Sequence, residues 1–184
     1  MLHQIVSFLL DVVAGLLCGT CLLRIYMQWQ RIPFSNPVGR LVFALSDWLV
    51  LPLRRAIVPV GRLDLASLLA ALLVELVQYL LLWLLFGAGA GWQWLPWLAL
   101  FGVVRVALTG MAGLLIAYAV LSWVQGHAQS PVSDVIARLS EPLLRPVRRV
   151  LPLVGGVDLS PLVVLVLLQV ALMVLGHLQF GPLQ

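Results

Sequence analysis

Ionisable side chains that fall inside long apolar segments are the residues of this 184-residue chain best placed to do chemistry. A charge at the centre of a bilayer costs from about 2.5 to more than 10 kcal/mol, so each one needs a structural or chemical reason. Glu75 and Arg105 each fall about ten residues into an apolar segment, which is roughly 15 Å along a helix. Gln169 occupies a similar depth in another segment, and Asp11 lies somewhat nearer a segment end.

These four positions leave two interpretations open. We expect Arg105 to pair with Glu75, with Asp11 or with both, where the two halves of the chain meet. A structural pair of this kind fixes the register and rotation of the helices. Two carboxylates beside one arginine cannot both ionise at low cost, so the same cluster could instead hold a proton or a cation.

A second set of candidates consists of arginines that flank short apolar runs. The stretch SEPLLRPVRRVLPLVGGVDLSP, residues 140–161, is typical of a basic helix that lies in the headgroup layer of a membrane. Such arginines predict either anchoring to anionic phospholipids or a docking surface for a protein partner. The candidate docking residues are Arg54, Arg55, Arg145, Arg148 and Arg149.

Other patterns that carry chemistry are weak in this sequence. Cys18 and Cys21 form a CxxC, but no histidine follows to make a haem attachment motif, and Gly15 and Gly19 beside them favour close helix packing. The three histidines lack metal-ligand spacing within a helix. The sequence shows no Ser-His-Asp arrangement and no phosphate-binding glycine loop. We therefore expect no catalytic residue, metal or cofactor.

The elements that must position these residues are transmembrane helices. The chain is 62% hydrophobic and 10% charged, whereas soluble proteins average about 25% charged residues. Only helices satisfy the backbone across a bilayer here, because no segment alternates as a barrel strand does. We predict an all-α membrane protein with spans at about 5–27, 65–86, 95–123 and 159–178. The first span lacks a basic start, so we expect it to be retained rather than cleaved as a signal peptide.

The distribution of arginines predicts the orientation of the chain. Arginines are concentrated between spans one and two and between spans three and four, whereas the loop at 87–94 has no charge. By the positive-inside rule both connectors face the cytoplasm and both termini face outward. A bacterial inner membrane fits this pattern, with anionic phospholipids as partners and no role for nucleic acid.

The two halves of the chain correspond without a gap at a separation of 94 residues. Matching positions include Ser46 and Ser140, Arg54 and Arg148, and Asp64 and Asp158. We therefore predict two tandem repeats, at 1–86 and 95–184, each formed by a span, a cytoplasmic connector and a second span. An even number of spans in each repeat makes the two repeats parallel.

Each connector, at about 31–63 and 126–157, is expected to form short amphipathic helices. In the second connector Ser130 is a plausible N-cap, and Pro142 is expected to end the first helix, with another starting near Pro146. Asp64 is expected to cap the second span, and Asp158 or Ser160 the fourth, where an acidic group also faces the positive end of the helix dipole. Arg24, near the inner end of span one, is expected to reach the headgroups.

These residues resemble the YggT family, also called YlmG, of small bacterial membrane proteins with relatives in chloroplasts. The resemblance rests on LLRIYMQW at 22–29, SNP at 35–37, EPLLRPVRRVLP at 141–152 and GGVDLSP at 155–161. The first half departs from this pattern at Trp48, Leu51 and Arg62. The resemblance implies an assembly or scaffold factor more than an enzyme. Roles implied for the family include envelope or division organisation, osmotic or ion tolerance and, in chloroplast relatives, cytochrome maturation.

The sequence thus favours a non-catalytic membrane scaffold that presents its two connectors to a partner at the inner surface. The alternative is a small ion channel or transporter that works as a homo-oligomer, with Glu75, Arg105 and Asp11 lining the path. Four spans are few for a transporter, so this alternative requires self-association.

Overall fold

The computed structural model describes residues 1–56, 64–87, 91–124, 130–150 and 158–180, and these residues form helices joined by short turns, with no strand among them. Four helices are long and apolar enough to cross a membrane, which confirms the prediction of an all-α chain with four spans. The elements in chain order are α1 (Leu2–Trp29), α2 (Pro37–Ala56), α3 (Leu65–Phe86), the single 3₁₀ turn η1 (Trp92–Trp94), α4 (Leu95–Val124), α5 (Pro131–Arg148) and α6 (Ser160–Phe180).

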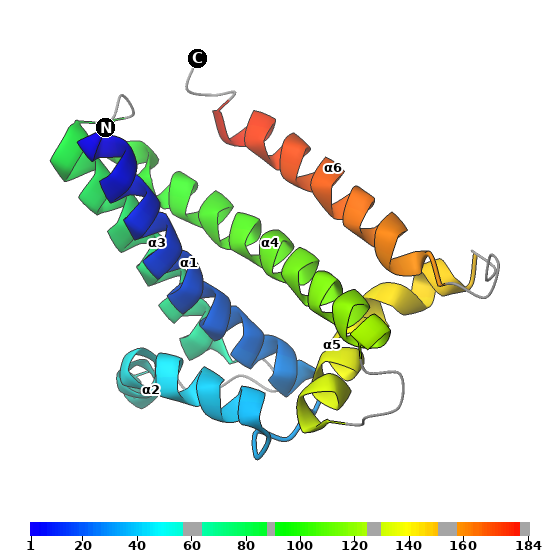
Figure 1. Cartoon of the computed structure of the whole chain (residues 1–184). Coiled ribbons are helices and arrows are strands. Elements are labelled where there is room, and N and C mark those ends of the chain that lie inside the picture. The colour runs from blue at the N-terminus through cyan, green and yellow to red at the C-terminus, as the bar shows by residue number, and fades with distance from the viewer. Residues whose placement is uncertain (57–63, 88–90, 125–129, 151–157, 181–184) are drawn as a thin grey trace.

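The spans and the connector helices occupy different parts of the molecule. The start of α1 and the end of α6 lie at one end, and α2 and α5 lie across the other end, beneath the spans (Figure 1). α4 runs between the pair formed by α1 and α3 on one side and α6 on the other (Figure 1). Each connector helix therefore contacts the ends of the two spans that it joins.

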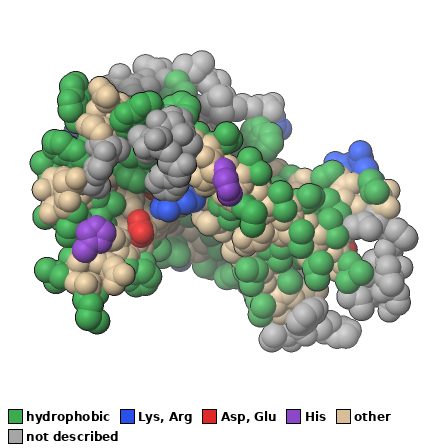
Figure 2. All heavy atoms as spheres, turned by 90° about the horizontal axis from the view of Figure 1, so that it is seen from above, with side chains coloured by type: hydrophobic (Ala, Val, Ile, Leu, Met, Phe, Trp, Pro, Cys, Tyr) green, Lys and Arg blue, Asp and Glu red, His purple; other side chains and the backbone are tan. Residues whose placement is uncertain are grey.

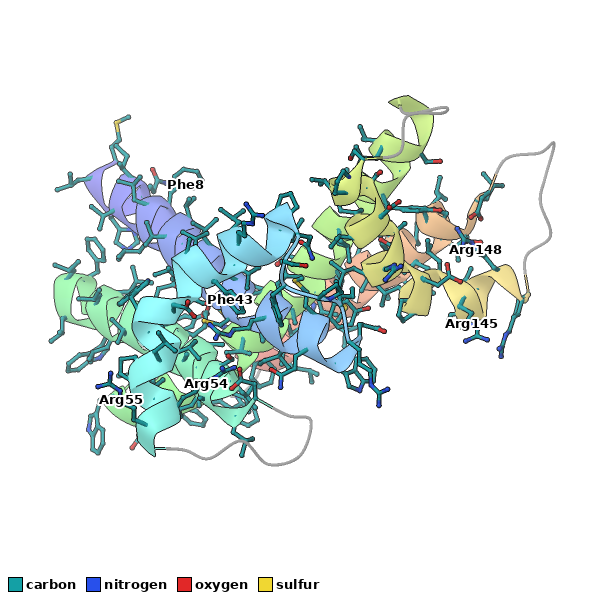
Figure 3. All side chains as sticks on the ribbon, turned by 90° about the horizontal axis from the view of Figure 1, so that it is seen from below. Phe8, Phe43, Arg54, Arg55, Arg145 and Arg148 are labelled. Atoms are coloured by element: carbon teal, nitrogen blue, oxygen red, sulfur yellow. The ribbon has the colours of Figure 1, made fainter. Side chains whose placement is uncertain are left out.

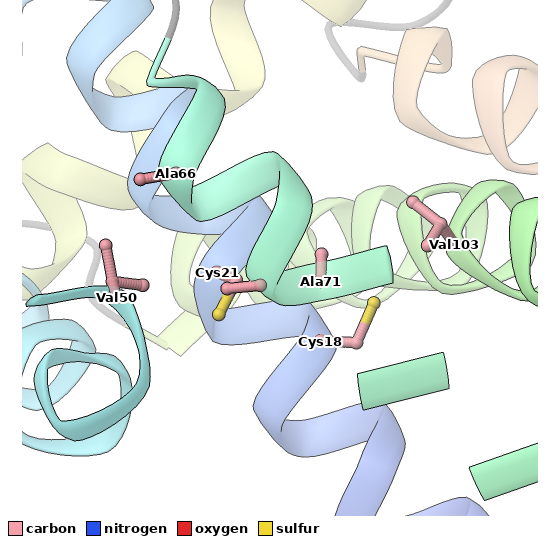
Figure 4. Close-up of a cluster of buried hydrophobic side chains, with 7 residues drawn as sticks. Cys18, Cys21, Val50, Ala66, Ala71 and Val103 are labelled. Atoms are coloured by element: carbon pink, nitrogen blue, oxygen red, sulfur yellow. The ribbon is translucent and has the colours of Figure 1, made fainter. Parts of the chain in front are cut away.

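Three clusters of buried side chains hold the helices together. Cys18 and Cys21 of α1 meet Val50 of α2, small residues of α3 and Val103 of α4 in the first cluster (Figure 4). The alanines of α3 in this cluster let the helix backbones approach closely, as in other membrane bundles. The two cysteines are free and lie inside this cluster, so their surroundings in the structure are those of packing residues.

The other two clusters attach the second connector. Leu144 of α5 packs with residues of α4 and α6, including Leu115 and Val164. Val135 and Leu139 of α5 pack with residues of the first half, including Met27. The Tyr26 hydroxyl donates a hydrogen bond of 2.8 Å to the carbonyl oxygen of Leu139, so α5 is also joined to α1.

Both connector helices begin at side-chain caps. Ser130 accepts a hydrogen bond from the Ser133 backbone N–H, and the Ser133 hydroxyl accepts one from the Ser130 backbone N–H, so the two form a capping box. This confirms the predicted start of the second connector helix. Asn36 accepts a hydrogen bond from the Gly39 backbone N–H at the start of α2. At the end of α3, Gly87 adopts a left-handed conformation with a φ of 58°, which glycine adopts without steric cost.

The prediction that Pro142 ends the first helix of the second connector is wrong. α5 continues through Pro142 and Pro146 to Arg148, and α2 likewise continues through Pro52. A proline inside a helix removes one hydrogen bond and bends the helix, and both connector helices change direction along their length (Figure 3). Burial of Val135, Leu139 and Leu144 along α5 offsets that local cost, so one bent helix forms instead of two short ones.

Candidate functional site: two connector joints and an intramembrane cluster

The first connector joint is built around Asp64, which precedes α3. Its carboxylate accepts hydrogen bonds from the Ser67 backbone N–H at 3.3 Å and from the Ser67 hydroxyl at 2.7 Å, so Asp64 caps α3. Arg54, near the end of α2, also donates to this carboxylate. The Asp64 side chain is only 1% exposed. A single buried carboxylate thus fastens the end of the connector to the start of the next span.

Arg24 of α1 enters the same joint, and the prediction that it reaches the headgroups is wrong. Arg24 is buried, and its Nη1 donates hydrogen bonds of 2.9 Å to the Ser46 hydroxyl and 2.6 Å to Asp47 on α2. Its Nε lies 3.8 Å from Asp64, and its guanidinium lies over the ring of Phe43 at 4.7 Å. The connector supplies these partners by folding across the end of α1, so the guanidinium is neutralised without reaching the lipid surface.

The second connector joint is built around Arg148, at the end of α5. Its guanidinium donates hydrogen bonds of 2.8 Å to Asp158, 2.9 Å to Glu141 and 2.9 Å to the Tyr118 hydroxyl on α4. Asp158 in turn accepts a hydrogen bond of 2.9 Å from the backbone N–H of Ser160, the first residue of α6. Arg148 therefore connects α5 to α4 and to the start of α6.

The charges at both joints alter the protonation of the two aspartates. Burial alone raises the pKa of the Asp64 carboxyl, but the hydrogen bonds from Arg54 and Ser67 and the charge of Arg54 outweigh it, so the pKa lies below its ordinary value. The pKa of Asp158 is also lowered, because hydrogen bonds from Ser160 and Arg148 outweigh the effect of burial. Both carboxylates are therefore stabilised in their ionised form.

The five predicted docking arginines divide into two groups. Arg54 and Arg148 are occupied by the carboxylates of the joints. Arg55, Arg145 and Arg149 are exposed, and none of them makes an ion pair with an acidic residue in the described part of the chain. Figure 3 shows Arg54 and Arg55 on α2 and Arg145 and Arg148 on α5 at the connector end of the molecule. At each joint one arginine is thus paired with an acidic side chain, and the arginine next to it is exposed without such a pair among the described residues.

Of the predicted intramembrane cluster, the structure brings Asp11 and Arg105 together. Arg105 Nη2 lies 3.8 Å from Asp11 Oδ1, and Gln78 of α3 also donates a hydrogen bond to Asp11. The side chains of this ion pair are 43% and 47% exposed. Viewed from the end that carries the first residue of α1, charged side chains of both signs are visible amid hydrophobic ones (Figure 2).

The other two predicted members are placed differently. Glu75 is fully buried, with 0% exposure, and neither carboxyl oxygen has a hydrogen-bond partner among the described residues. It packs so closely against α4 that a Cβ at Gly102 would overlap its Oε2. Gln169 is exposed on α6 and makes no side-chain hydrogen bond to Asp11, Glu75 or Arg105. Asp11, Glu75 and Arg105 therefore form the intramembrane cluster without Gln169.

Several residues of the joints were not predicted as site residues. They include Tyr118, and also Ser46 and Asp47, which bond to Arg24. The signal was present in the 94-residue correspondence, in which Ser46 and Asp47 match Ser140 and Glu141. No group of three or more histidine, cysteine or acidic side chains within the described ranges is arranged to hold a metal ion.

Comparison with protein-family models explains why the two halves of the chain share the positions of the joints. The family model described as CCB3/YggT matches residues 3–85 and again residues 97–179, so it covers nearly all of the chain. The chain belongs to the CCB3/YggT family. The resemblance read from the sequence is thereby confirmed, and the two matched ranges of this YggT-family chain each contain one connector joint.

Individual relatives agree with the family assignment. The chain is 37% identical to the protein named YggT of Escherichia coli K12 over 169 residues, which cover 89% of this chain and 85% of the relative. It is 33% identical to a protein of Vibrio alginolyticus over 96% of each chain. A protein of Pseudomonas aeruginosa is 34% identical over 88% of this chain and 83% of its own length. No solved structure matches the chain.

Proposed function

We propose that this YggT-family chain is a non-catalytic scaffold or assembly factor of the bacterial inner membrane. In this proposal two basic amphipathic connectors are presented at the cytoplasmic surface to a protein partner that organises the envelope or assembles a membrane complex. The observation that carries the proposal is that the connector arginines divide into a set paired with acidic side chains and a set that is exposed and unpaired among the described residues. Arg54 and Arg148 fix each connector to the next span. Arg55 and Arg145 stay exposed on helices held in place by the joints, and Arg149 is exposed directly after α5.

The proposed orientation follows from the position of the connectors. α2 and α5 lie at the end of the bundle opposite to the start of α1 and the end of α6 (Figure 1). Because the exposed arginines gather with the connectors, the positive-inside rule favours a cytoplasmic location for this end and an outer location for both termini. The two matches of the family model, over 3–85 and 97–179, support two parallel repeats.

The lipid surface is a partner in this proposal as well. α5 buries Val135, Leu139 and Leu144 and exposes Arg138 and Arg145. A helix with this division lies in the interfacial layer, where anionic headgroups attract its arginines by about 1 kcal/mol each. Docking of a protein partner therefore has to be distinguished from lipid anchoring by experiment.

The test is affinity purification of the tagged full-length chain in mild detergent, followed by mass spectrometry of the proteins that co-purify. The test variant is Arg145→Gln with Arg149→Gln, which removes one exposed charge from the last turn of α5 and one from the residue that follows it, and leaves the Arg148 joint in place. The matched control is Arg31→Gln with Arg40→Gln, which removes two exposed charges at and before the start of α2. We expect specific partners to be lost in the test variant and kept in the control.

Two results would contradict docking through α5. If the same proteins co-purify with the wild type and both variants, the arginines of α5 serve lipid anchoring alone. If both double variants lose the same proteins to the same degree, only net charge matters, and the geometry of α5 is irrelevant.

A second function is favoured by one observation, the intramembrane cluster. An ion pair between Asp11 and Arg105 and a buried Glu75 are expensive in a membrane, and such residues often mark ion pathways. The alternative is a small channel or transporter, linked to osmotic or ion tolerance, that works as a homo-oligomer. Within one chain Glu75 reaches no surface, so a path past it requires a second copy or a change in helix packing.

Ion flux into proteoliposomes tests this alternative. Wild-type protein should conduct cations or protons, and Glu75→Gln should reduce the flux strongly. Flux that is absent, or indifferent to this substitution, counts against a channel or transporter and leaves the scaffold proposal untouched.

A further inference from the structure

Glu75 is a buried acidic residue whose carboxyl has no directly bonded partner in the described structure. It lies ten residues after the first residue of α3, which is roughly 15 Å along the helix. Its side chain is fully buried and both carboxyl oxygens lack a hydrogen-bond partner in the described structure. Burial of an ionised carboxylate without a directly bonded partner costs several kcal/mol even after relaxation.

The nearby charge that could compensate Glu75 is already engaged. The ionisable groups that face Glu75 are Cys18 and Asp11 of α1, Tyr79 of its own helix and Arg105 of α4. Arg105 lies 3.8 Å from Asp11, and within the described ranges it makes no ion pair with Glu75. Asp11 also receives a hydrogen bond from Gln78. The direct contacts of the positive charge and of the amide donor thus both go to Asp11 and not to Glu75.

Helix packing closes the space around the Glu75 carboxyl. Gly102 allows the backbone of α4 to approach the carboxyl directly, because any larger residue there would overlap Oε2. Cys18, 0% exposed, lies beside Glu75 and packs in a cluster with Ala71 of α3 (Figure 4). A contact this close leaves no room on the Gly102 side of the carboxyl for a hydrated cation, whereas a proton requires no additional space.

We propose that Glu75 is an intramembrane proton-binding site and that its side chain is a neutral carboxylic acid at neutral pH. The ligand is a proton, held on a carboxyl oxygen, and Asp11 is the ionised carboxylate that pairs with Arg105. This assignment goes beyond the scaffold function and does not depend on it. It also holds whether or not ions cross the membrane, because it concerns the protonation of one side chain in the resting protein.

The first test uses the hydrophobic reagent dicyclohexylcarbodiimide on the full-length protein in liposomes at neutral pH. A protonated carboxyl gives its proton to a carbodiimide nitrogen, and its oxygen adds to the central carbon to form an O-acylisourea. The acyl group then migrates to nitrogen and leaves a stable N-acylurea, with no leaving group. Peptide mass spectrometry should find this adduct on Glu75 in the wild type, and neither on Asp11 nor at position 75 of Glu75→Gln.

The second test detects the proton without a reagent. Infrared spectra of the wild type and Glu75→Gln should differ by the C=O stretch of one carboxylic acid, and Glu75→Met provides an apolar replacement of similar length if the glutamine variant does not fold. A missing acid band together with no adduct on Glu75 would overturn the assignment, because the carboxyl would then be ionised or hold a metal cation. The acid band with no adduct would support it, since the reagent would then be excluded by packing.

Discussion

Both connector joints fasten a connector helix to the next span, but the groups around the shared arginine–aspartate contact differ. In each, an arginine near the end of the connector, Arg54 or Arg148, bonds to an aspartate that precedes the next span, Asp64 or Asp158. The first joint is buried, with Asp64 1% exposed, whereas the Asp158 side chain is 29% exposed. The comparison shows that the arginine–aspartate contact is the shared element, and that its burial differs between the halves.

The residue that differs most between the joints is the one supplied by the preceding span. Arg24 in α1 corresponds to Tyr118 in α4 at the 94-residue separation. Arg24 brings a second positive charge to the first joint, and it is balanced by Asp47 and Asp64. Tyr118 contributes a neutral hydroxyl that accepts from Arg148. The first joint therefore holds two cations and two anions where the second joint holds one cation with Glu141 and Asp158.

The two joints also differ in how the aspartate bonds to the start of the next span, and this difference has a simple physical cause. Asp64 accepts from the backbone N–H of Ser67, but the residue that corresponds to Ser67 is Pro161, which has no N–H. Asp158 instead accepts a hydrogen bond from the backbone N–H of Ser160, which aligns with the residue before Ser67. The same acidic residue thus contacts the start of both spans through a locally different turn.

The largest effect is expected from replacing the two aspartates. Asp64→Ala removes a helix cap and the buried partner of two arginines, so we expect a loss of about 3 kcal/mol in unfolding free energy. Asp158→Ala removes a more exposed partner and should cost about 1 kcal/mol. Unfolding of the purified variants in mild detergent, followed by circular dichroism, measures both. Equal losses would show that burial does not distinguish the joints.

The next largest effect is expected from replacing the residue that the preceding span contributes to each joint. Arg24→Gln leaves Asp47 without its cation and removes the contact with Phe43, so we expect a loss of about 2 kcal/mol. Tyr118→Phe removes one hydrogen bond to Arg148 and should cost about 1 kcal/mol. The same unfolding measurement compares them. A larger loss for Tyr118→Phe would mean that the second joint depends more strongly on its span.

Much of the fold was predictable because it depends on local composition. The four spans follow from the length of the apolar segments, and the caps at Asp64 and Ser130 follow from residue type and position. The continuous course of α5 was not predictable from Pro142 alone, because it depends on the packing of Leu139 and Leu144 against other helices. Local preference for a break and the gain from burial are opposed here, and only the second requires tertiary structure.

The candidate site was predictable in its residue types and less so in its pairings. The sequence indicates that Arg105 needs a carboxylate but offers both Asp11 and Glu75, and the choice depends on helix rotation. The burial of Arg24 depends on α2 folding back across α1, with partners about twenty residues further along the chain, such as Ser46. The spacing of residues within one helix does not predict contacts of this kind, which join two different helices.

Acid should weaken both connector joints. The folded-state pKa of both Asp64 and Asp158 is lowered, so their contribution to stability is complete above the unfolded value of about 3.9 and is lost as pH falls through the folded pKa. Protonation removes the charge but leaves the side chain, so the loss should be smaller than in the alanine variants. Unfolding in detergent from about pH 5 down to about pH 2 should show a reduced acid sensitivity in Asp64→Ala. Unchanged acid sensitivity in that variant would assign the loss to other carboxyls.

The smallest effect separates two adjacent arginines of the first connector. Arg54 donates to Asp64, and Arg55 is exposed with no acidic partner among the described residues. Arg54→Gln should therefore cost about 1 kcal/mol, and Arg55→Gln should stay within about 0.5 kcal/mol of the wild type. Both variants lose one positive charge, so a general electrostatic effect would change them equally. A clear difference in unfolding free energy would show that the paired arginine holds the connector in place, and would leave the unpaired one available for a lipid or protein partner.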